Sequence, residues 1–550
     1  MKSFHGLCFA AALFAAATCA HAAEAREARP VARAPAGVVR GVEGGGLEIY
    51  KGVPYAAAPV GEMRWKPPAP APVWEGEFDA ANFGPACMQY RANPQSVYAE
   101  TLAAMSEDCL SLNIWKPANA KGAPVFFWIH GGSLQAGAGS QRMFDGAKLA
   151  EKGLVVVSIN YRLGALGYLA HPELSAESPD GISGNYGLLD QIAALKWVQR
   201  NIAAFGGDPD NVTIAGESAG ALSVMYLMAS PPARGLFHKA ITQSAYMIST
   251  PALKEARYGM PAAEGVGVYV AGKLGAENIA ALRAMGADEL IRKSLQAGYI
   301  AWGTVDGVLL PDELVNVFDR GEQAPVPIIA GFNSGEIRSL RILMPKKPAN
   351  AGDYEKAIRD AYGDLADAFL KQYPPENIDE SMLATTRDAM YGWTSERLVR
   401  KQTEAGASGY LYIFNHSYPA ANNAGLHAFH AIEIPYVFGT IDDTTPNWPE
   451  VPDTAVEKRM SAAMVNYWSS FARDGAPSAS GEHEWRPYSD GEAYMYFAEA
   501  PEGRATHLLP GMYELHEEVM CRRRAAGDVA WTWNVGVGSP PLPPQAPGCR

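Results

Sequence analysis

The sequence predicts an α/β fold with a large, mostly parallel central sheet, helices on both faces and cap-like helical insertions. Residues 125–129 and 154–159 are continuous apolar runs, which are typical of parallel strands buried on both faces. A helical pattern separates the second run from the next strand-like segment. With 550 residues, 48% of them hydrophobic, the chain has enough apolar material to bury a core of this size.

Strand and helix signals alternate along the chain. Predicted strands cover residues 125–129, 154–159, 212–215, 328–330 and 410–414. Between the second and third strands, apolar residues recur at helical spacing from Leu188 to Ile202, and a Gly-Gly-Asp-Pro segment at 206–209 ends this helix. Residues 250–390 are more helical and acidic, and we expect them to place helices over the sheet.

The first 22 residues have the pattern of a cleavable secretory signal. Lys2 supplies a positive charge, residues 7–18 form an apolar stretch too short to span a membrane, and Ala-His-Ala at 20–22 fits a cleavage site. The alternative is a buried N-terminal helix. No later apolar run is long enough for a transmembrane helix, so we expect a secreted or periplasmic protein without a membrane anchor.

The mature chain is expected to form one domain, since no internal repeat or clear linker divides it. Residues 23–37, rich in Ala, Arg and Pro, are predicted to be a mobile N-terminus, residues 38–535 the folded domain, and residues 536–550 a Pro-rich, extended tail. The formal net charge of −13 argues against nucleic acid or an anionic membrane as the main partner. A small-molecule substrate remains compatible with this charge, and no metal-ligand spacing appears.

Removal of the signal leaves four cysteines, Cys87, Cys109, Cys521 and Cys549. An even number in an exported chain suggests disulfides. Of the three possible pairings, Cys87–Cys109 together with Cys521–Cys549 closes two short loops and is favoured. The second bridge would tie the C-terminal tail down. Four free thiols are the alternative.

A candidate nucleophile lies where a predicted strand meets a predicted helix. Residues 212–220 read V-T-I-A-G-E-S-A-G, so that Gly216, Ser218 and Gly220 form the G-x-S-x-G pattern of a sharp strand–turn–helix elbow. The small flanking residues allow the tight turn, and the helix start favours negative charge near the serine hydroxyl. The pattern alone also arises by chance, so its value depends on other motifs.

Two longer segments carry a family resemblance. Residues 205–220 read F-G-G-D-P-D-N-V-T-I-A-G-E-S-A-G and residues 107–117 read E-D-C-L-S-L-N-I-W-K-P. Together they resemble the signature segments of the type-B carboxylesterase/lipase family, which includes the cholinesterases. Further matching pieces lie at 50–56, 160–162 and 184–187, and the resemblance runs from Gly44 to about Met520. It implies an α/β-hydrolase fold, hydrolysis of small-molecule esters through an acyl-enzyme, and a bacterial-type secreted carboxylesterase without metal or organic cofactor.

The resemblance also implies a catalytic triad, which activates a serine that is a weak nucleophile on its own. In this fold the order is serine, acid, histidine. Glu336 matches the family's acid and is preferred over Asp306, which has the context of a turn residue. His430 matches the family's base and is preferred over the nearby His427.

A strand followed by Trp-Ile-His-Gly-Gly-Ser at 128–133 matches the first oxyanion loop of the family. By this match, the N–H groups of Gly132, Ser133 and Ala219 are expected to bind the oxyanion. Ser133 stands where the family usually has a third glycine, so its side chain should narrow the hole and limit access for esters of bulky tertiary alcohols. We expect His130 to be structural.

The resemblance suggests further pocket residues: Glu217, Trp302, Arg338 and His427. Glu217 matches a family position near the triad. Arg338 and Arg341 follow the acid; one of them could favour an anionic ester, although solvated surface arginines are the preferred interpretation. No tryptophan lies between Cys87 and Cys109, where cholinesterases carry a cation-binding one, so choline esters are not expected.

Two alternative functions share the expected fold. The first is a non-catalytic binding protein similar to the cholinesterase-like adhesion proteins, which have lost triad members; this chain keeps a serine, an acid and a histidine. The second keeps the triad and acts on amides, carbamates or polyesters. The acyl and alcohol preference and the oligomeric state do not follow from the sequence.

Overall fold

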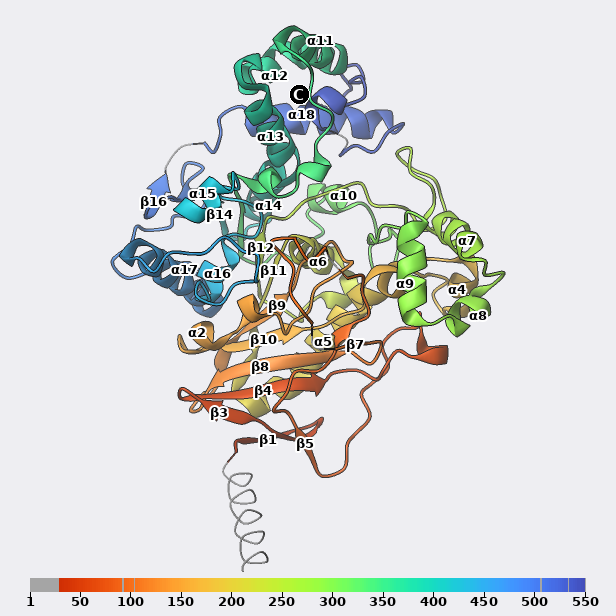
Figure 1. Cartoon of the computed structure of the whole chain (residues 1–550), viewed down its shortest axis with the longest axis vertical. Coiled ribbons are helices and arrows are strands. Elements are labelled where there is room, and N and C mark those ends of the chain that lie inside the picture. Colours follow the sequence, from red (N-terminus) through yellow and green to blue (C-terminus); the bar gives the residue numbers. More distant parts are fainter. Residues whose placement is uncertain (1–28, 92, 103, 505–506, 533, 550) are drawn as a thin grey trace, which may run out of the picture.

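The computed structural model describes residues 29–91, 93–102, 104–504, 507–532 and 534–549; the predicted signal at 1–22 lies outside them (Figure 1). The strands are β1 (Val31–Ala34), β2 (Gly37–Arg40), β3 (Val42–Gly44), β4 (Leu47–Pro54), β5 (Glu77–Asp79), β6 (Ala86–Cys87), β7 (Met105–Ser106), β8 (Ser111–Pro117), β9 (Ala123–Ile129), β10 (Val155–Ile159), β11 (Gly207–Glu217), β12 (Lys239–Gln243), β13 (Ile328–Asn333), β14 (Gly409–Phe414), β15 (Tyr494–Phe497) and β16 (Pro501–Arg504).

The α-helices lie mainly between and after these strands. They are α2 (Ala147–Ala150), α3 (Gly164–Tyr168), α4 (Pro172–Glu177), α5 (Tyr186–Asn201), α6 (Ala219–Ala229), α7 (Ala263–Leu274), α8 (Ile279–Ala284), α9 (Ala287–Gln296), α10 (Leu314–Asp319), α11 (Ala351–Tyr362), α12 (Ala366–Gln372), α13 (Ile378–Arg387), α14 (Trp393–Glu404), α15 (Pro419–Asn423), α16 (Ile434–Phe438), α17 (Ala455–Asp474) and α18 (Met512–Ala526). Within the described ranges, none of them is long and apolar enough to cross a membrane.

The central sheet confirms the predicted fold class. Its strand order is β16-β15-β14-β13-β12-β11-β9-β10-β8-β4-β3. The strands from β15 through β10 in this order run parallel, while β16 at one edge and β8, β4 and β3 at the other pair antiparallel (Figure 1). The sheet is therefore mostly parallel, as expected for strands that alternate with helices.

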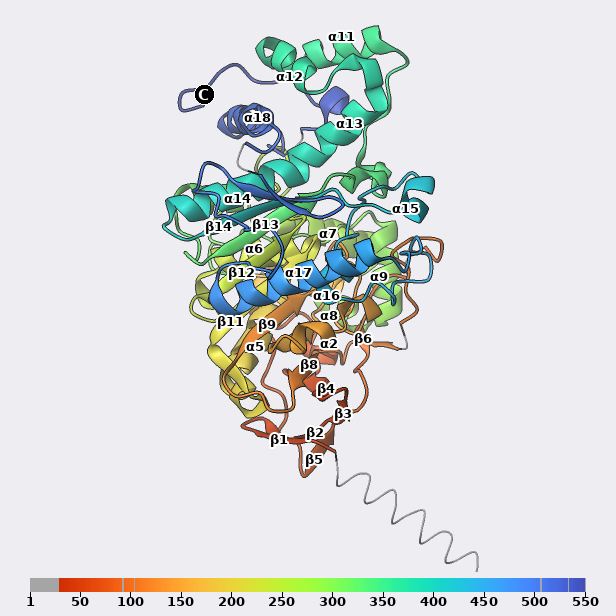
Figure 2. The same cartoon turned by 90° about the vertical axis from the view of Figure 1, so that its left-hand side faces the viewer.

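The two faces of the sheet bury two separate cores. Because side chains alternate along a strand, Phe127 and Ile129 of β9 pack on the core of α5 and α6, while Phe126 and Trp128 pack on the core of α16 and α17. Figure 2 shows α17 lying across the parallel strands, and it contacts both β9 and β11. This two-sided burial explains the continuous apolar runs in the sequence.

The five strands and the long helix that the sequence predicts are all present; most ends shift by three residues or fewer, but β11 begins at Gly207, within the segment predicted to be a turn. One central strand, β12, was not predicted. Its sequence, Lys-Ala-Ile-Thr-Gln, reads as half polar, yet Thr242 and Gln243 are fully buried. At the N-terminus, Val31–Ala34 forms β1 and pairs with β2, whereas we expected residues 23–37 to be mobile.

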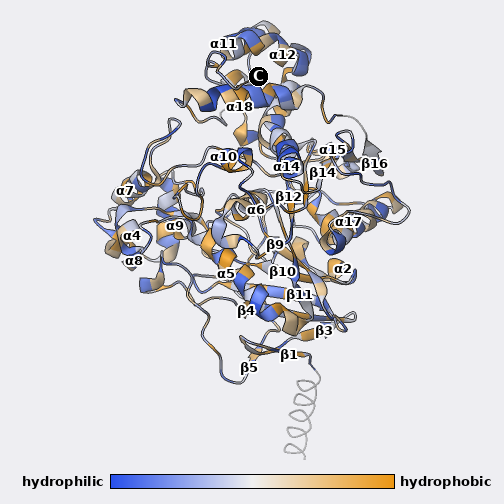
Figure 3. Cartoon of the chain, turned by 180° about the vertical axis from the view of Figure 1, so that it is seen from behind, coloured by the Kyte–Doolittle hydropathy of each residue, from blue (hydrophilic) through white to orange (hydrophobic). Residues whose placement is uncertain are grey.

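Helices from the 250–390 region lie outside the sheet, as predicted. In Figure 1, α7, α8 and α9 lie on one side, and α11, α12 and α13 form the top together with α18. This second group has its own small core, which contains Tyr354, Ile358, Phe369 and Val519. Figure 3 shows mixed hydrophilic and hydrophobic colouring on α11, α12 and α18, as expected for helices with one buried face.

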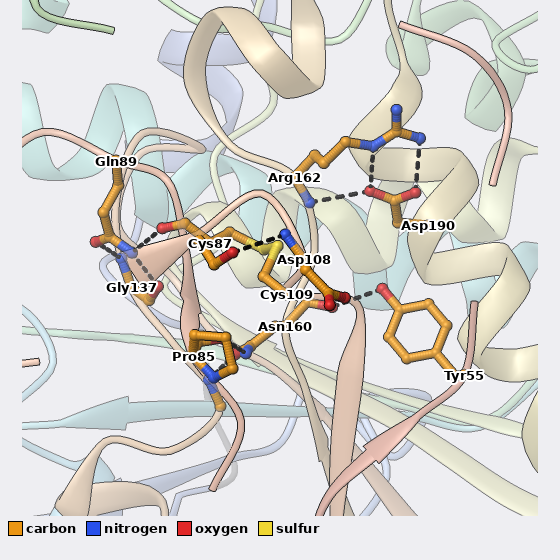
Figure 4. Close-up of a disulfide and its surroundings, with 12 residues drawn as sticks. Tyr55, Pro85, Cys87, Gln89, Asp108, Cys109, Gly137, Asn160, Arg162 and Asp190 are labelled. Atoms are coloured by element: carbon orange, nitrogen blue, oxygen red, sulfur yellow. Dashed lines mark hydrogen bonds and ion pairs between the residues drawn. A yellow bond between two sulfur atoms is a disulfide. The ribbon is translucent and has the colours of Figure 1, made fainter. Parts of the chain in front are cut away.

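Two disulfides close the loops that the sequence favours. Cys87–Cys109 spans 22 residues and lies beside the ends of β8 and β10 (Figure 4). Cys521–Cys549 spans 28 residues and joins α18 to the C-terminal tail. The tail also donates a hydrogen bond from the amide of Leu542 to Ala361 in α11, so it lies against the upper helices.

A buried ion pair fixes the turn after β10 to α5. Arg162 donates hydrogen bonds from Nε and Nη2 to the two carboxylate oxygens of Asp190, each at 2.8 Å, and its amide donates to the same carboxylate at 3.0 Å (Figure 4). Asp190 is 0% exposed. The guanidinium also lies over the ring of Tyr186, 5.4 Å from its centroid, and within the described residues Nη1 has no hydrogen-bond partner.

We predict that Asp190→Ala lowers the free energy of unfolding by about 3–5 kcal/mol, because it leaves a buried guanidinium without a counter-charge. Urea denaturation followed by circular dichroism measures the effect. The control is Glu289→Gln, which removes a solvent-exposed ion pair to Lys293 and should leave the denaturation midpoint unchanged. Equal destabilisation by both variants would contradict the prediction.

Candidate active site

The predicted elbow lies between β11 and α6. Ser218 has φ 55° and ψ −122°, a strained conformation for a non-glycine residue. A Cβ atom on Gly216 would lie 2.4 Å from the carbonyl carbon of Gly220, and one on Gly220 would lie 2.1 Å from the oxygen of Ile129. Both glycines are therefore required sterically. The amide of Ser218 donates to the oxygen of Gln243 in β12 at 2.9 Å, which fixes the turn to the sheet.

The loop after β9 lies directly against this elbow. A Cβ atom on Gly131 would lie 3.3 Å from Cβ of Ser218. Gly132 has φ 101° and Ser133 has φ 58°. Within the part of the chain that the structure describes, the amides of Gly132 and Ser133 have no hydrogen-bond acceptor. Ala219 begins α6, where the first N–H groups lack intrahelical partners. Three amides are thus free to bind a negative oxygen beside Ser218.

His130 has a structural position in this loop. It is buried, its Nδ1 lies 2.9 Å from the oxygen of Gly131, and its ring stacks on Tyr161 with centroids 4.5 Å apart. Tyr161 in turn donates a hydrogen bond to the oxygen of His130. Burial lowers the pKa of His130 to about 4, so the ring is neutral at physiological pH.

Glu336 and His430 meet although 94 residues separate them in the chain. The His430 Nδ1 atom lies 2.5 Å from Oε2 of Glu336. The other carboxylate oxygen of Glu336 accepts hydrogen bonds from the hydroxyl of Ser244 at 2.6 Å and from the amide of Asn333 at 2.8 Å. Glu336 is 0% exposed. These contacts hold its carboxylate in one orientation toward the imidazole.

The second ring nitrogen of His430 faces a different carboxylate. Its Nε2 lies 3.1 Å from Oε1 of Glu217, the residue before Ser218. Ser218 and His430 are both described, and no hydrogen bond joins them. Hydrogen bonds between catalytic groups often tighten only when substrate is bound. In this structure the imidazole is therefore held between two glutamates.

Charge and burial oppose each other at His430. Burial disfavours the imidazolium, but Glu217 and Glu336 favour it more strongly, so that the pKa of His430 is raised above 6.5. The pKa of Glu217 is raised as well, because burial disfavours its charged form more strongly than the attraction of His430 favours it. The pKa of each group therefore depends on the charge of the other.

Several residues of this site carry no signal that the sequence analysis used. Glu433, three residues after His430, is fully buried and accepts hydrogen bonds from Gln243 and Asn333. Ser244 follows the unpredicted strand β12. Tyr391, on a π-helical turn at Asp388–Gly392, lies with its ring 5.4 Å from that of His430. π-Helical turns occur frequently at functional sites, but this turn becomes visible only in the structure.

Other candidate residues lie apart from the Glu336–His430 pair. Asp306 accepts hydrogen bonds from three successive backbone amides at 308–310, as a turn residue does. His427 lies largely in solvent. The small buried part of its ring and the nearby Arg338 lower its pKa. Arg338 forms an ion pair with Glu380 at 2.6 Å. Arg341 is exposed, and Trp302 is half-buried against the large core.

A mostly parallel sheet with a serine at a strand–turn–helix elbow, facing a buried glutamate–histidine pair, is the architecture of an α/β-hydrolase. A family model described as the carboxylesterase family matches residues 28–512, and the chain belongs to this family of carboxylic ester hydrolases.

Several esterases are similar to this chain. A fumonisin B1 esterase of Sphingopyxis macrogoltabida is 35% identical over 512 residues, which cover 89% of this chain and 90% of that protein. A para-nitrobenzyl esterase of Bacillus subtilis is 34% identical, with 82% and 91% covered. Among solved structures, a para-nitrobenzyl esterase has a TM-score of 0.75 at 31% identity, covering 86% of this chain and 97% of that one. A carboxylesterase of Geobacillus stearothermophilus has a TM-score of 0.74 at 32% identity, covering 86% and 98%.

We predict that kcat/KM for ester hydrolysis rises with pH through an apparent pKa above 6.5, since a histidine acts as a base only when neutral and the pKa of His430 is raised. Glu217→Gln removes a negative charge that favours the imidazolium, so it should move this limb of the profile to lower pH. Stopped-flow or steady-state pH profiles of both proteins measure the shift. A limb at or below pH 6.5 in the unmodified protein would contradict the assignment.

Proposed function

We propose that this carboxylesterase works through an acyl-enzyme formed on Ser218, with His430 as general base and acid and Glu336 as the group that orients the imidazole. The single observation that carries the proposal is the buried Glu336–His430 contact of 2.5 Å, whose imidazole also reaches Glu217, the residue before the elbow serine. In the first step His430 takes the hydroxyl proton while Oγ of Ser218 attacks the ester carbonyl. The proton then passes to the leaving alkoxide, and the alcohol departs.

Water completes the reaction by the same route. His430 removes a proton from water, the hydroxide adds to the acyl carbonyl, and the proton returns to Oγ of Ser218 as the carboxylic acid leaves. During both additions the carbonyl oxygen becomes negative. We infer that the amides of Gly132, Ser133 and Ala219 bind this charge, and one such donor typically contributes about 10²–10³ in rate.

Glu217 affects the first step because it lies at the nitrogen that must accept the serine proton. We propose that substrate binding brings Ser218 within hydrogen-bond reach of Nε2 and that Glu217 then gives up that nitrogen.

The relatives are named for different esters, fumonisin B1 in one case and para-nitrobenzyl in another, so ester hydrolysis is what we transfer to this chain. Disulfides and the lack of a membrane-spanning helix among the described residues support an exported protein.

We predict that Ser218→Ala reduces the hydrolysis of p-nitrophenyl acetate by about 10⁴–10⁶-fold, the loss typical for removal of a triad nucleophile. Absorbance of released p-nitrophenol measures the rate. The thermal unfolding midpoint should stay that of the unmodified protein, which shows that the fold is retained. Hydrolysis at the original rate by a folded Ser218→Ala protein would show that Ser218 is not the nucleophile, and a binding function would then be the better proposal.

We predict that Ser133→Gly raises activity on esters of tertiary alcohols relative to esters of primary alcohols. Ser133 lies in the left-handed region, where glycine is not strained, so the change should not cost stability. Loss of its side chain widens the hole on the side where a bulky alcohol must fit. The ratio of tert-butyl acetate to ethyl acetate hydrolysis, measured by titration of released acid, tests this. An unchanged ratio would mean that Ser133 does not limit the alcohol.

A further inference from the structure

The loop closed by Cys87–Cys109 contacts both halves of the candidate active site. Near its start, Gln89 exchanges two hydrogen bonds of 2.8 Å with the backbone of Gly137, at the far end of the oxyanion loop (Figure 4). Further along, Tyr98 reaches the opposite half, where His430 and Glu336 lie. Neither Gln89 nor Tyr98 belongs to the proposed triad or to the proposed oxyanion donors, so both residues contact the site from outside it.

Tyr98 connects the segment that carries His430 to the segment that carries Glu336. Its hydroxyl donates a hydrogen bond to the backbone oxygen of His430 at 2.9 Å. Because a carbonyl can only accept, the tyrosine oxygen is left to accept from the hydroxyl of Ser339, 2.7 Å away. Ser339 lies three residues after Glu336. Burial raises the pKa of Tyr98 well above 10, so its hydroxyl keeps the proton that these contacts need.

The tyrosine ring adds a second contact with the same histidine. It stands edge-on to the His430 imidazole, with centroids 6.4 Å apart and planes at 81°. Tyr391 lies on another side of this imidazole, 5.4 Å away. Phe429 and Trp448 also pack on Tyr98, at 6.5 and 6.2 Å. The histidine ring is thus confined by aromatic rings as well as by carboxylates.

The backbone around Tyr98 is fixed by a segment that follows the histidine in sequence. Thr445 donates to the oxygen of Val97, and Asn447 donates to the oxygen of Ser96 at 3.0 Å. The tyrosine is consequently held from both sides: its backbone by residues 445–447 and its side chain by His430 and Ser339. A side chain constrained in this way can fix the position of another group.

We propose that Tyr98 is a positioning residue of the esterase, which holds the backbone of His430 against the Glu336 segment and keeps the imidazole aligned between acid and nucleophile. The inference rests on the proposed function, since it assigns His430 as the base. Tyr98 touches no reacting atom. It acts by restricting the two segments that must stay in register for proton transfer, where a displacement of about 1 Å can cost about 10² in rate.

Tyr98→Phe tests the proposal, because it keeps the ring and removes both hydrogen bonds. We expect kcat to fall about tenfold and KM to change less than about twofold, since positioning acts on the chemical step. The acid limb of the kcat/KM profile should move to lower pH, because looser contact with Glu336 favours the imidazolium less. Ser339→Ala, which leaves the bond to His430, should give a smaller loss of kcat. Unchanged kcat and an unchanged pH limb in Tyr98→Phe would overturn the proposal, as would a rise in KM alone.

Two further measurements separate this proposal from the proposed function. Tyr90→Phe alters a tyrosine of the same loop that is 38% exposed, and it should behave as the unmodified protein. The downfield proton of the His430–Glu336 hydrogen bond, followed by ¹H NMR, should shift or broaden in Tyr98→Phe and not in Tyr90→Phe. Activity that survives Ser218→Ala would contradict the proposed function while this resonance still reports on Tyr98. An identical resonance in both tyrosine variants would contradict positioning by Tyr98.

Discussion

The site depends on keeping one imidazole and three carboxylates together away from water. A buried carboxylate must replace its lost hydration with hydrogen bonds or a counter-charge. Glu336 has two hydrogen-bond donors and His430, and Glu433 has two amide side chains. Glu217 has only the imidazole, and its Oε1 has no hydrogen bond in the described chain. The least compensated carboxylate is therefore the one where a proton is most stable, and it lies beside the proposed nucleophile.

The topology brings these groups to one place because parallel strands end at the same edge of the sheet. The elbow follows β11, the oxyanion loop follows β9, and Ser244 directly follows β12. Glu336 comes three residues after β13, and His430 lies beyond the end of β14. Segments more than 200 residues apart in sequence thus lie close together at this edge of the sheet.

The parts of the site that the sequence predicts are those with local signatures. The elbow needs Gly216 and Gly220 for steric reasons, so its motif can be recognised in the amino-acid sequence. Strand β12 has no such local pattern, because Thr242 and Gln243 are polar yet buried, and their partners lie on distant elements. Tyr98 is a similar case: its hydrogen bond to His430 spans 332 residues, and nothing near Tyr98 in sequence indicates it. Short motifs can therefore be predicted from the sequence. The hydrogen-bond partners of buried polar groups lie far away in the sequence and become known only from the fold.

The elbow itself explains why the side chains of Glu217 and Ser218 lie beside the same loop. In an extended strand, neighbouring side chains point to opposite faces, and these two would never meet the same group. The φ of 55° at Ser218 breaks that alternation. A Cβ atom on Gly131 would lie 2.9 Å from a carboxylate oxygen of Glu217 and 3.3 Å from Cβ of Ser218, so both side chains face the same loop. The strained turn therefore also brings the Glu217 carboxylate, whose Oε1 lies 3.1 Å from Nε2 of His430, next to Ser218.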